Sequence, residues 1–116
     1  MGRPDALFET DARHMGDGVV LSLTGELDMA SAPTLHRAVE RTHDKGPIVI
    51  DLRDLSFIDS TGIRALIEVY SAGQNGHSTV SFIRAQPHVQ RVLQMAGVEG
   101  LLAWADLPDE EATEAT

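Results

Sequence analysis

The feature that most constrains this chain is an apolar strand that leads, after a short connecting stretch, into an amphipathic helix. Residues 48–52, Ile-Val-Ile-Asp-Leu, are β-branched and nearly all apolar, which is typical of a strand covered on both faces. After Ser60, apolar residues recur at i, i+3, i+4 and i+7, and this period predicts a helix that runs to about Gly73. A buried strand followed by such a helix indicates a parallel β-α-β arrangement.

Weaker patterns on both sides extend this arrangement. Residues 7–13 and 19–24 flank a Met-Gly-Asp-Gly turn and predict a hairpin, and residues 25–28 are expected to form a linker that ends in a carboxylate. The further elements expected are a helix that starts at residues 31–33 and stops at 45–47, a strand at 79–83, a helix from Pro87 to Gly97, a short strand at 101–104 and a terminal helix at 109–115. The apolar face expected on the helix from Pro87 consists of Val89, Val92, Leu93 and Ala96.

Strands that alternate with helices predict an α/β fold: a single, mostly parallel sheet with an antiparallel edge hairpin and helices packed against it. At 116 residues the chain is long enough for one core and too short for two. We expect one domain over residues 1–116, with its core at about 7–104 and an acidic C-terminal tail at about 105–116.

The balance of charge excludes two classes of partner. Nine basic and 18 acidic residues give a net charge of −9, which opposes binding to nucleic acid and to anionic membrane surfaces, since both require basic side chains. The chain has no cysteine, so disulfides and thiol chemistry are excluded. No apolar run approaches the roughly 18 residues that span a bilayer, and we expect a cytoplasmic protein.

The main candidate for a functional group is the hydroxyl of Ser60. In a parallel sheet, ligands and partners meet the carboxyl ends of the strands, and both Asp28 and the Asp59-Ser60 pair follow predicted strands at that end. If the two strands are neighbours, these side chains converge on one exposed patch, and Gly62 leaves the backbone beside Ser60 uncovered. The local pattern also fits a simpler role, in which Ser60 only caps its helix and Asp28 only ends a strand.

Catalytic chemistry has weaker support. A nucleophile elbow requires glycine two residues before and two after the serine, and here Ile58 occupies the first position and Gly62 the second. No histidine follows a strand in a way that marks a general base, and none forms an H-x-x-x-H pair for a metal ion; the histidines are His14, His36, His43, His77 and His88. Phosphate-binding glycine motifs are absent as well. We expect no enzymatic activity, no metal and no cofactor.

Three segments, in this order and spacing, resemble the anti-sigma factor antagonists, a family built on the STAS domain. They are Leu-Thr-Gly-Glu-Leu-Asp at residues 23–28, the strand at 48–52 with Phe-Ile-Asp-Ser-Thr-Gly at 57–62, and the stretch at 89–98. The resemblance covers the chain from about Leu7 to about Trp104 and implies a STAS-like fold.

The resemblance also implies a function. Members of this family bind an anti-sigma factor that is also a serine kinase and so free its sigma factor; the kinase phosphorylates the antagonist, which then dissociates, and a serine phosphatase resets it. On this chain the phosphorylated serine falls on Ser60, with Thr61 as the second candidate. The implied partner-binding residues are Asp28, Asp59, Ser60, Thr61, Gly62 and Arg64. Arg64 departs from the family, in which small or apolar residues are frequent at that position.

Two alternatives stay open beside this interpretation. The first is a STAS interaction module that does not use phosphorylation and belongs to a larger sensory or transport assembly. The second, more remote, is a hydrolase that depends on Ser60. For the antagonist, a phosphate at a helix N-terminus beside Asp28 and Asp59 predicts a switch by electrostatic exclusion with little change of shape.

Overall fold

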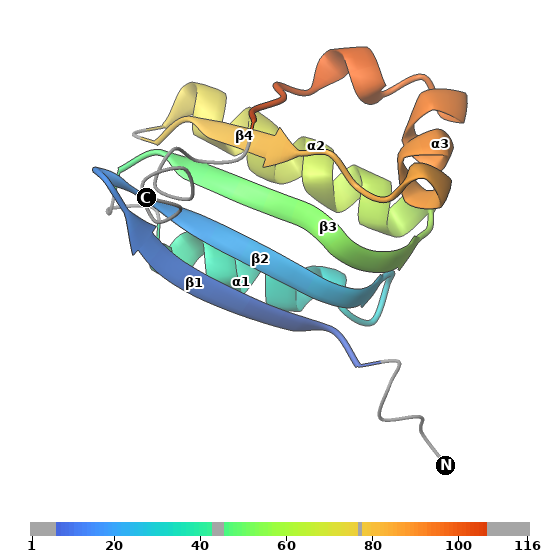
Figure 1. The fold of residues 1–116 in the computed structure, drawn as a ribbon, viewed down its shortest axis with the longest axis horizontal. Helices are drawn as coiled ribbons and strands as arrows, with labels where there is room; N and C mark the ends of the chain where they lie inside the picture. The colour runs from blue at the N-terminus through green and yellow to red at the C-terminus, as the bar shows by residue number, and fades with distance from the viewer. Residues whose placement is uncertain (1–6, 43–45, 77, 107–116) are drawn as a thin grey trace, which may run out of the picture.

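The chain folds around a four-stranded sheet. The computed structural model describes residues 7–42, 46–76 and 78–106. The strands, in their order across the sheet, are β1 (Glu9–Met15), β2 (Gly18–Leu27), β3 (Ile48–Ile58) and β4 (Val80–Ile83) (Figure 1). β1 and β2 run antiparallel, whereas β2 with β3 and β3 with β4 form parallel pairs. The predicted α/β fold with an antiparallel edge hairpin is confirmed.

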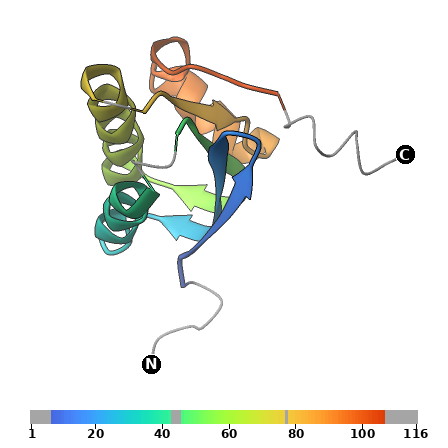
Figure 2. The same cartoon turned by 90° about the vertical axis from the view of Figure 1, so that its left-hand side faces the viewer.

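Two long helices cover one face of this sheet. α1 (Ala32–Thr42) and α2 (Ser60–Asn75) lie side by side against it (Figures 1 and 2), whereas α3 (Pro87–Met95) lies beyond the end of β4 and contacts β3. A single turn of 3-10 helix, η3 (Glu99–Leu101), follows α3. In the described part of the chain, no helix has both the length and the apolar composition that crossing a bilayer requires.

The core fills the space between the sheet and these two helices. Ile48, Ile50 and Leu52 of β3 are fully buried and belong to one cluster with Leu35 of α1 and Leu66 of α2. Burial of one such side chain contributes roughly 1.5–3 kcal/mol to folding. The apolar row predicted at residues 48–52 therefore anchors both helices.

β2 and β3 are longer than their sequence patterns indicated. β2 continues through the expected linker to Leu27, and β3 continues from Leu52 to Ile58. The parallel pairing passes two register shifts, the second of them after Gly25, where the backbone has φ +100° and a β-carbon would lie 2.2 Å from the Leu7 carbonyl oxygen. Each shift places one extra residue in β3, whose buried residues after Leu52 lie three apart at Leu55 and Ile58, so the alternation stops there. In β2 the alternation continues to Leu27, and it is Gly25 that indicates a linker instead of a strand.

The C-terminal region also differs from expectation. Val89 and Leu93 of α3 are buried as predicted, but Val92 and Ala96 are exposed and Gln90 is buried instead. Gln90 is satisfied there, because its amide oxygen accepts from the N–H of Ala85 and its nitrogen donates to the Glu99 carboxylate. The strand predicted at 101–104 is reduced to a parallel bridge between Trp104 and Phe82; the helix predicted at 109–115 lies outside the described residues.

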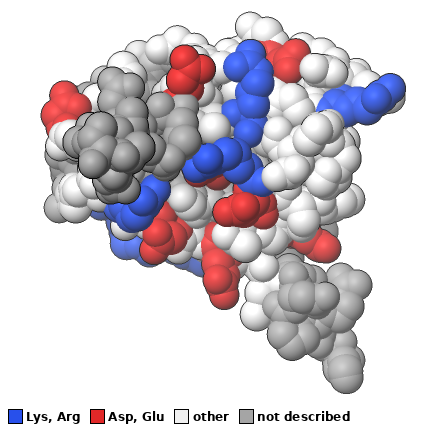
Figure 3. All heavy atoms as spheres, viewed as in Figure 1, with Lys and Arg blue, Asp and Glu red and all other residues white. Residues whose placement is uncertain are grey.

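The face of the sheet opposite α1 and α2 carries acidic and basic side chains intermixed (Figure 3). Asp51 of β3 is buried there and is held by Arg53, whose guanidinium donates to it at 2.8 and 3.0 Å and whose backbone N–H donates at 3.0 Å. Burial alone would raise the pKa of Asp51, but these hydrogen bonds and the charges of Arg53 and Arg13 hold that pKa below its usual value of 3.8.

Protonation of Asp51 should therefore weaken the fold in acid. Because the pKa is lower in the folded chain, the stabilisation is fully present above the unfolded-state pKa of 3.8 and is lost as pH falls through the folded-state value. In urea unfolding from neutral pH to about pH 2.5, Asp51→Asn should lose about 1 kcal/mol at neutral pH and respond less to acid than the parent. Asp54→Asn, at an exposed position of the same strand, is the control; identical acid responses of the parent and Asp51→Asn would contradict this.

Candidate functional site

The carboxyl ends of β2 and β3 lie side by side. Leu27 of β2 pairs with Ile58 of β3, and the N–H of Asp59 donates a 3.3 Å hydrogen bond to the Leu27 carbonyl. The chain therefore leaves both strands at the same edge, through Asp28 toward α1 and through Asp59 toward α2. The strands are neighbours, which is the condition under which Asp28, Asp59 and Ser60 come together.

Asp59, not Ser60, is the N-cap of α2. The backbone of Asp59 is extended, at φ −117° and ψ −173°, and its carboxylate accepts a 2.9 Å hydrogen bond from the N–H of Gly62. Its carbonyl accepts the N–H of Ile63 at 2.9 Å. The simpler role considered for Ser60, a helix cap, is therefore wrong.

Ser60 is the first residue of α2. The residue is exposed, and its oxygen forms no hydrogen bond with any residue that the structure describes. Thr61, the next residue, is half-buried. Of the two hydroxyls, that of Ser60 is the more accessible.

Gly62 has a packing role rather than the expected role of uncovering Ser60. It is buried, and a β-carbon there would lie 2.3 Å from the carbonyl oxygen of Leu27 and 2.8 Å from the Ile58 side chain. Glycine lets the first turn of α2 rest directly on the end of β2. This close approach sets how far Ser60 lies from Asp28.

Asp28 organises the loop between β2 and α1. Its carboxylate accepts hydrogen bonds from the N–H groups of Ala30 and Ser31 at 3.0 and 3.1 Å, and its carbonyl accepts the N–H of Ala32 at 2.9 Å. The buried Ser31 hydroxyl donates to the Glu26 carbonyl at 2.7 Å and accepts from the N–H of Asp28 at 2.9 Å. Asp28 thus has a structural role in addition to its charge.

Apolar and basic side chains border the same edge. Met29, directly after Asp28, is 75% exposed, and Phe57, close to the end of β3, is 45% exposed. Arg64 is exposed one turn into α2. From the sequence, Ser31 was identified only as a helix start, and Met29 and Phe57 were not placed at this edge. The Asp-x-x-Ser spacing of residues 28–31 is a signal for the contact between Asp28 and Ser31, but exposure of an apolar residue has no local signal.

No general base contacts the Ser60 hydroxyl among the described residues. His36 contacts Glu68 at 3.0 Å, and His88 contacts the Ser56 carbonyl at 2.9 Å. Within the described ranges, no group of three or more histidine and carboxylate side chains could hold a metal ion. Within the same ranges, the serine has no hydrogen-bonded base of the kind that activates a nucleophile.

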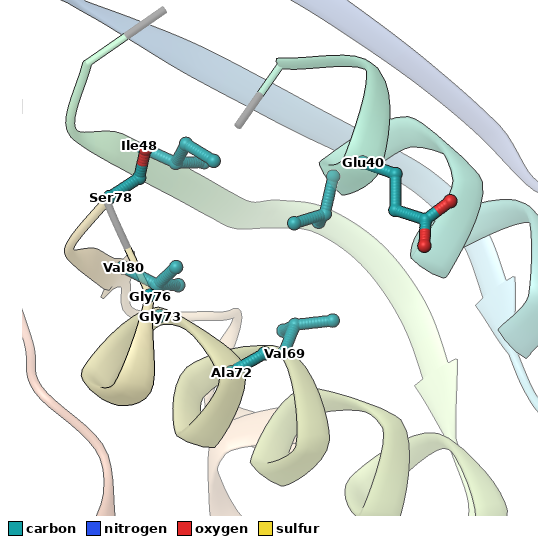
Figure 4. Close-up of a pocket in the computed structure, with 9 residues that line it drawn as sticks. Glu40, Ile48, Val69, Ala72, Gly73, Gly76, Ser78 and Val80 are labelled. Atoms are coloured by element: carbon teal, nitrogen blue, oxygen red, sulfur yellow. The ribbon is translucent and has the colours of Figure 1, made fainter. Parts of the chain in front are cut away.

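A hollow of about 430 Å³ lies at the other end of α2. Its lining is mostly apolar and comes from the last turns of α1 and α2 and the first residues of β3 and β4 (Figure 4). Ser60 and Gly73, which lines the hollow, are thirteen positions apart on α2, which is about 20 Å at the rise of an α-helix. The hollow is therefore separate from the edge that carries Ser60.

This fold and its serine-bearing edge agree with a known family. Residues 10–103 match the family model described as Mlab, STAS domain. The chain therefore belongs to the STAS domain family.

Two proteins that this chain is similar to are named as anti-sigma factor antagonists. The chain is 37% identical over 68 residues to the anti-sigma-F factor antagonist RsfB of Mycobacterium tuberculosis; the match covers 57% of this chain and 55% of RsfB, so the chain spans about half the length of that relative. The crystal structure of an anti-sigma factor antagonist from Mycobacterium paratuberculosis superposes with a TM-score of 0.72 and 26% identity, covering 98% of this chain and 97% of that one.

SpoIIAA has the same fold in two states. Its unphosphorylated form superposes with a TM-score of 0.69 at 21% identity, covering 92% of this chain and 95% of SpoIIAA. The phosphorylated form, from Bacillus, superposes with a TM-score of 0.64 at 21% identity, covering 94% of this chain and 98% of SpoIIAA.

Replacement of Gly62 by alanine should destabilise the fold. In a helix this change normally stabilises by up to about 1 kcal/mol, but here the added methyl group meets the Leu27 carbonyl, and overpacking typically costs about 1–3 kcal/mol. Urea unfolding should show a net loss for Gly62→Ala. Gly100→Ala is the control, since a β-carbon at that position meets nothing within 4 Å; equal stability of the two variants would contradict the packing role.

Proposed function

We propose that this chain is an anti-sigma factor antagonist whose binding is controlled by phosphorylation of Ser60. The unphosphorylated form binds an anti-sigma factor that is also a serine kinase, and the sigma factor held by that kinase is freed. Phosphorylation of Ser60 by the kinase ends the binding, and a serine phosphatase restores it. The protein itself acts by binding and catalyses no reaction.

The observation that carries this proposal is the free, exposed hydroxyl of Ser60 at the start of α2, with Asp28 and Asp59 at the same edge. The chain is similar to RsfB and to the Mycobacterium paratuberculosis protein, both named as anti-sigma factor antagonists. A kinase requires an accessible hydroxyl, and this one can be modified without the loss of any hydrogen bond between described residues.

A phosphate on Ser60 is compatible with the fold. It would lie at the N-terminus of α2, where unpaired N–H groups and the helix dipole favour an anion by about 0.3–1 kcal/mol per charge. The cap is supplied by Asp59 and is left intact. The similarity of this fold to both forms of SpoIIAA, with TM-scores of 0.69 and 0.64, supports a switch without refolding.

The phosphate would oppose binding through its charge. It adds about −1.5 to −2 charges beside the carboxylates of Asp28 and Asp59. Like charges brought together in an interface cost several kcal/mol, and each 1.4 kcal/mol is about tenfold in affinity. A loss of about two orders of magnitude in affinity is therefore expected on phosphorylation.

Removal of the Ser60 hydroxyl should separate binding from release. Ser60→Ala should bind the purified anti-sigma factor of the same organism with a Kd within about fivefold of the parent, since the hydroxyl forms no hydrogen bond with the described residues of the fold and a neutral hydrogen bond to the partner is worth about 1 kcal/mol. With ATP, the parent should be phosphorylated and released, whereas Ser60→Ala should stay bound, as measured by intact mass and size-exclusion chromatography. A non-hydrolysable ATP analogue should release neither.

Thr61→Ala is the matched control, because it removes the adjacent hydroxyl and leaves Ser60 in place. It should be phosphorylated and released like the parent. Release of Ser60→Ala at the parental rate would show that Ser60 is not the switch, and loss of release in Thr61→Ala would assign the switch to Thr61.

The exposed apolar side chains at the same edge should contribute to partner binding. Met29→Ser and Phe57→Ser should each weaken binding of the anti-sigma factor by about 5- to 30-fold, as expected for central apolar contacts worth about 1–2 kcal/mol. Leu101→Ser is the control, since Leu101 is 59% exposed on η3 and belongs to neither segment that ends at this edge. Calorimetric titration that shows equal affinities for all three variants would contradict this surface.

The second candidate is a STAS interaction module that does not use phosphorylation. The family model that matches residues 10–103 is described by the domain, Mlab, STAS domain, and not by a kinase-dependent activity. Intact-mass analysis of the protein isolated from its host under several growth conditions separates the two candidates, because the module has no phosphorylated fraction in any of them.

A further inference from the structure

A row of exposed side chains runs along α2 from its first residue. Ser60, Arg64 and Glu68 are spaced four residues apart and all three are exposed. Residues at this spacing are neighbours on one helix face. The row therefore places one guanidinium a single turn from the Ser60 hydroxyl.

Arg64 has no fixed partner in this row. The carboxylate of Glu68 contacts Nε2 of His36 on α1 at 3.0 Å, whereas Arg64 forms no ion pair or side-chain hydrogen bond within the part of the chain that the structure describes. A cation that precedes an anion by four residues is also the weaker orientation for such a pair on a helix, because it opposes the helix dipole. Glu68 is therefore a poor competitor for the Arg64 guanidinium.

We infer that Arg64 is the intramolecular partner of a phosphate on Ser60, an inference that rests on the proposed phosphorylation. The phosphate would occupy the N-terminal position and the guanidinium the position four residues later, which is the favourable orientation on a helix. Guanidinium groups bind phosphate through two parallel hydrogen bonds, which are among the strongest that side chains form. Arg64 can reach the phosphate by rotation of its side chain alone.

This pairing gives Arg64 a part in the switch. Phosphorylation would change the surface twice, since it adds an anion at Ser60 and withdraws the cation that Arg64 presents to a partner. A partner that contacts both positions would lose an attractive charge and meet a repulsive one. An antagonist with an apolar residue at this position would have only the second effect.

The pairing can be measured without a kinase or a partner. Phosphoserine is incorporated at position 60 during synthesis, and the phosphorus NMR shift is followed against pH at low salt, since the second ionisation of phosphoserine falls near about pH 6. The dianion is stabilised by Arg64, so its titration midpoint should lie about 0.3 pH units higher in Arg64→Gln than in the parent. Arg64→Lys should lie between them, and about 1 M salt should remove most of the difference.

Arg37→Gln is the matched control, because Arg37 is exposed on α1 and contacts Thr34; its midpoint should equal that of the parent. A midpoint in Arg64→Gln that equals the parental one would overturn the inference, even if phosphorylation still released the anti-sigma factor. Conversely, a higher midpoint in Arg64→Gln would support the pairing of Arg64 with the phosphate even if no kinase phosphorylates Ser60 in the host. If Arg64 had only a structural role, Arg64→Gln would lower the free energy of unfolding of the unphosphorylated protein in urea. We expect that free energy to be the same in Arg64→Gln and in the parent.

Discussion

The parallel pairing of β2 with β3 at their carboxyl ends is the constraint on which the rest of this site depends. The N–H of Asp59 donates to the Leu27 carbonyl, and Gly62 packs against that same carbonyl oxygen. One backbone group thus fixes both the end of the sheet and the start of α2. The positions of Asp28 and Ser60 relative to each other follow from it.

The residues at this edge divide structural and chemical roles between them. Asp59 caps α2 through the N–H of Gly62, and Asp28 with Ser31 holds the loop to α1, so side chains that stay in place fix both turns. Ser60 and Arg64 are left without such duties. A rigid base of satisfied groups with two unengaged side chains is suited to a surface that changes its charge while keeping its shape.

Much of the fold could be predicted from the sequence, because the strongest patterns belong to the residues that form the core. The apolar row at 48–52 and the helical period after Ser60 gave the parallel unit correctly, and neighbouring strands then implied that Asp28 and Ser60 follow strand ends at the same edge of the sheet. The end of β3 could not be predicted, since two register shifts each place an extra residue in that strand and break its alternation. The alternation of β2 does continue to Leu27, but Gly25 indicated a linker there. The buried Gln90 and the exposed Val92 depend on Glu99 and Ala85, which are contacts between segments that no local pattern encodes.

The placement of the α2 cap one residue before the serine has a consequence for how such a protein can diversify. Exchange of Ser60 for another residue removes the exposed hydroxyl and leaves the cap in place, whereas exchange of Asp59 removes the side chain that caps α2. The hydrogen bond to the Leu27 carbonyl comes from the Asp59 backbone and is kept in either case. The residue that maintains the start of α2 is therefore not the residue that carries the proposed regulation, and each can change without the other. Under the proposed control, a single substitution at Ser60 would make a copy of this protein bind its partner irrespective of the kinase, with the cap of α2 unchanged.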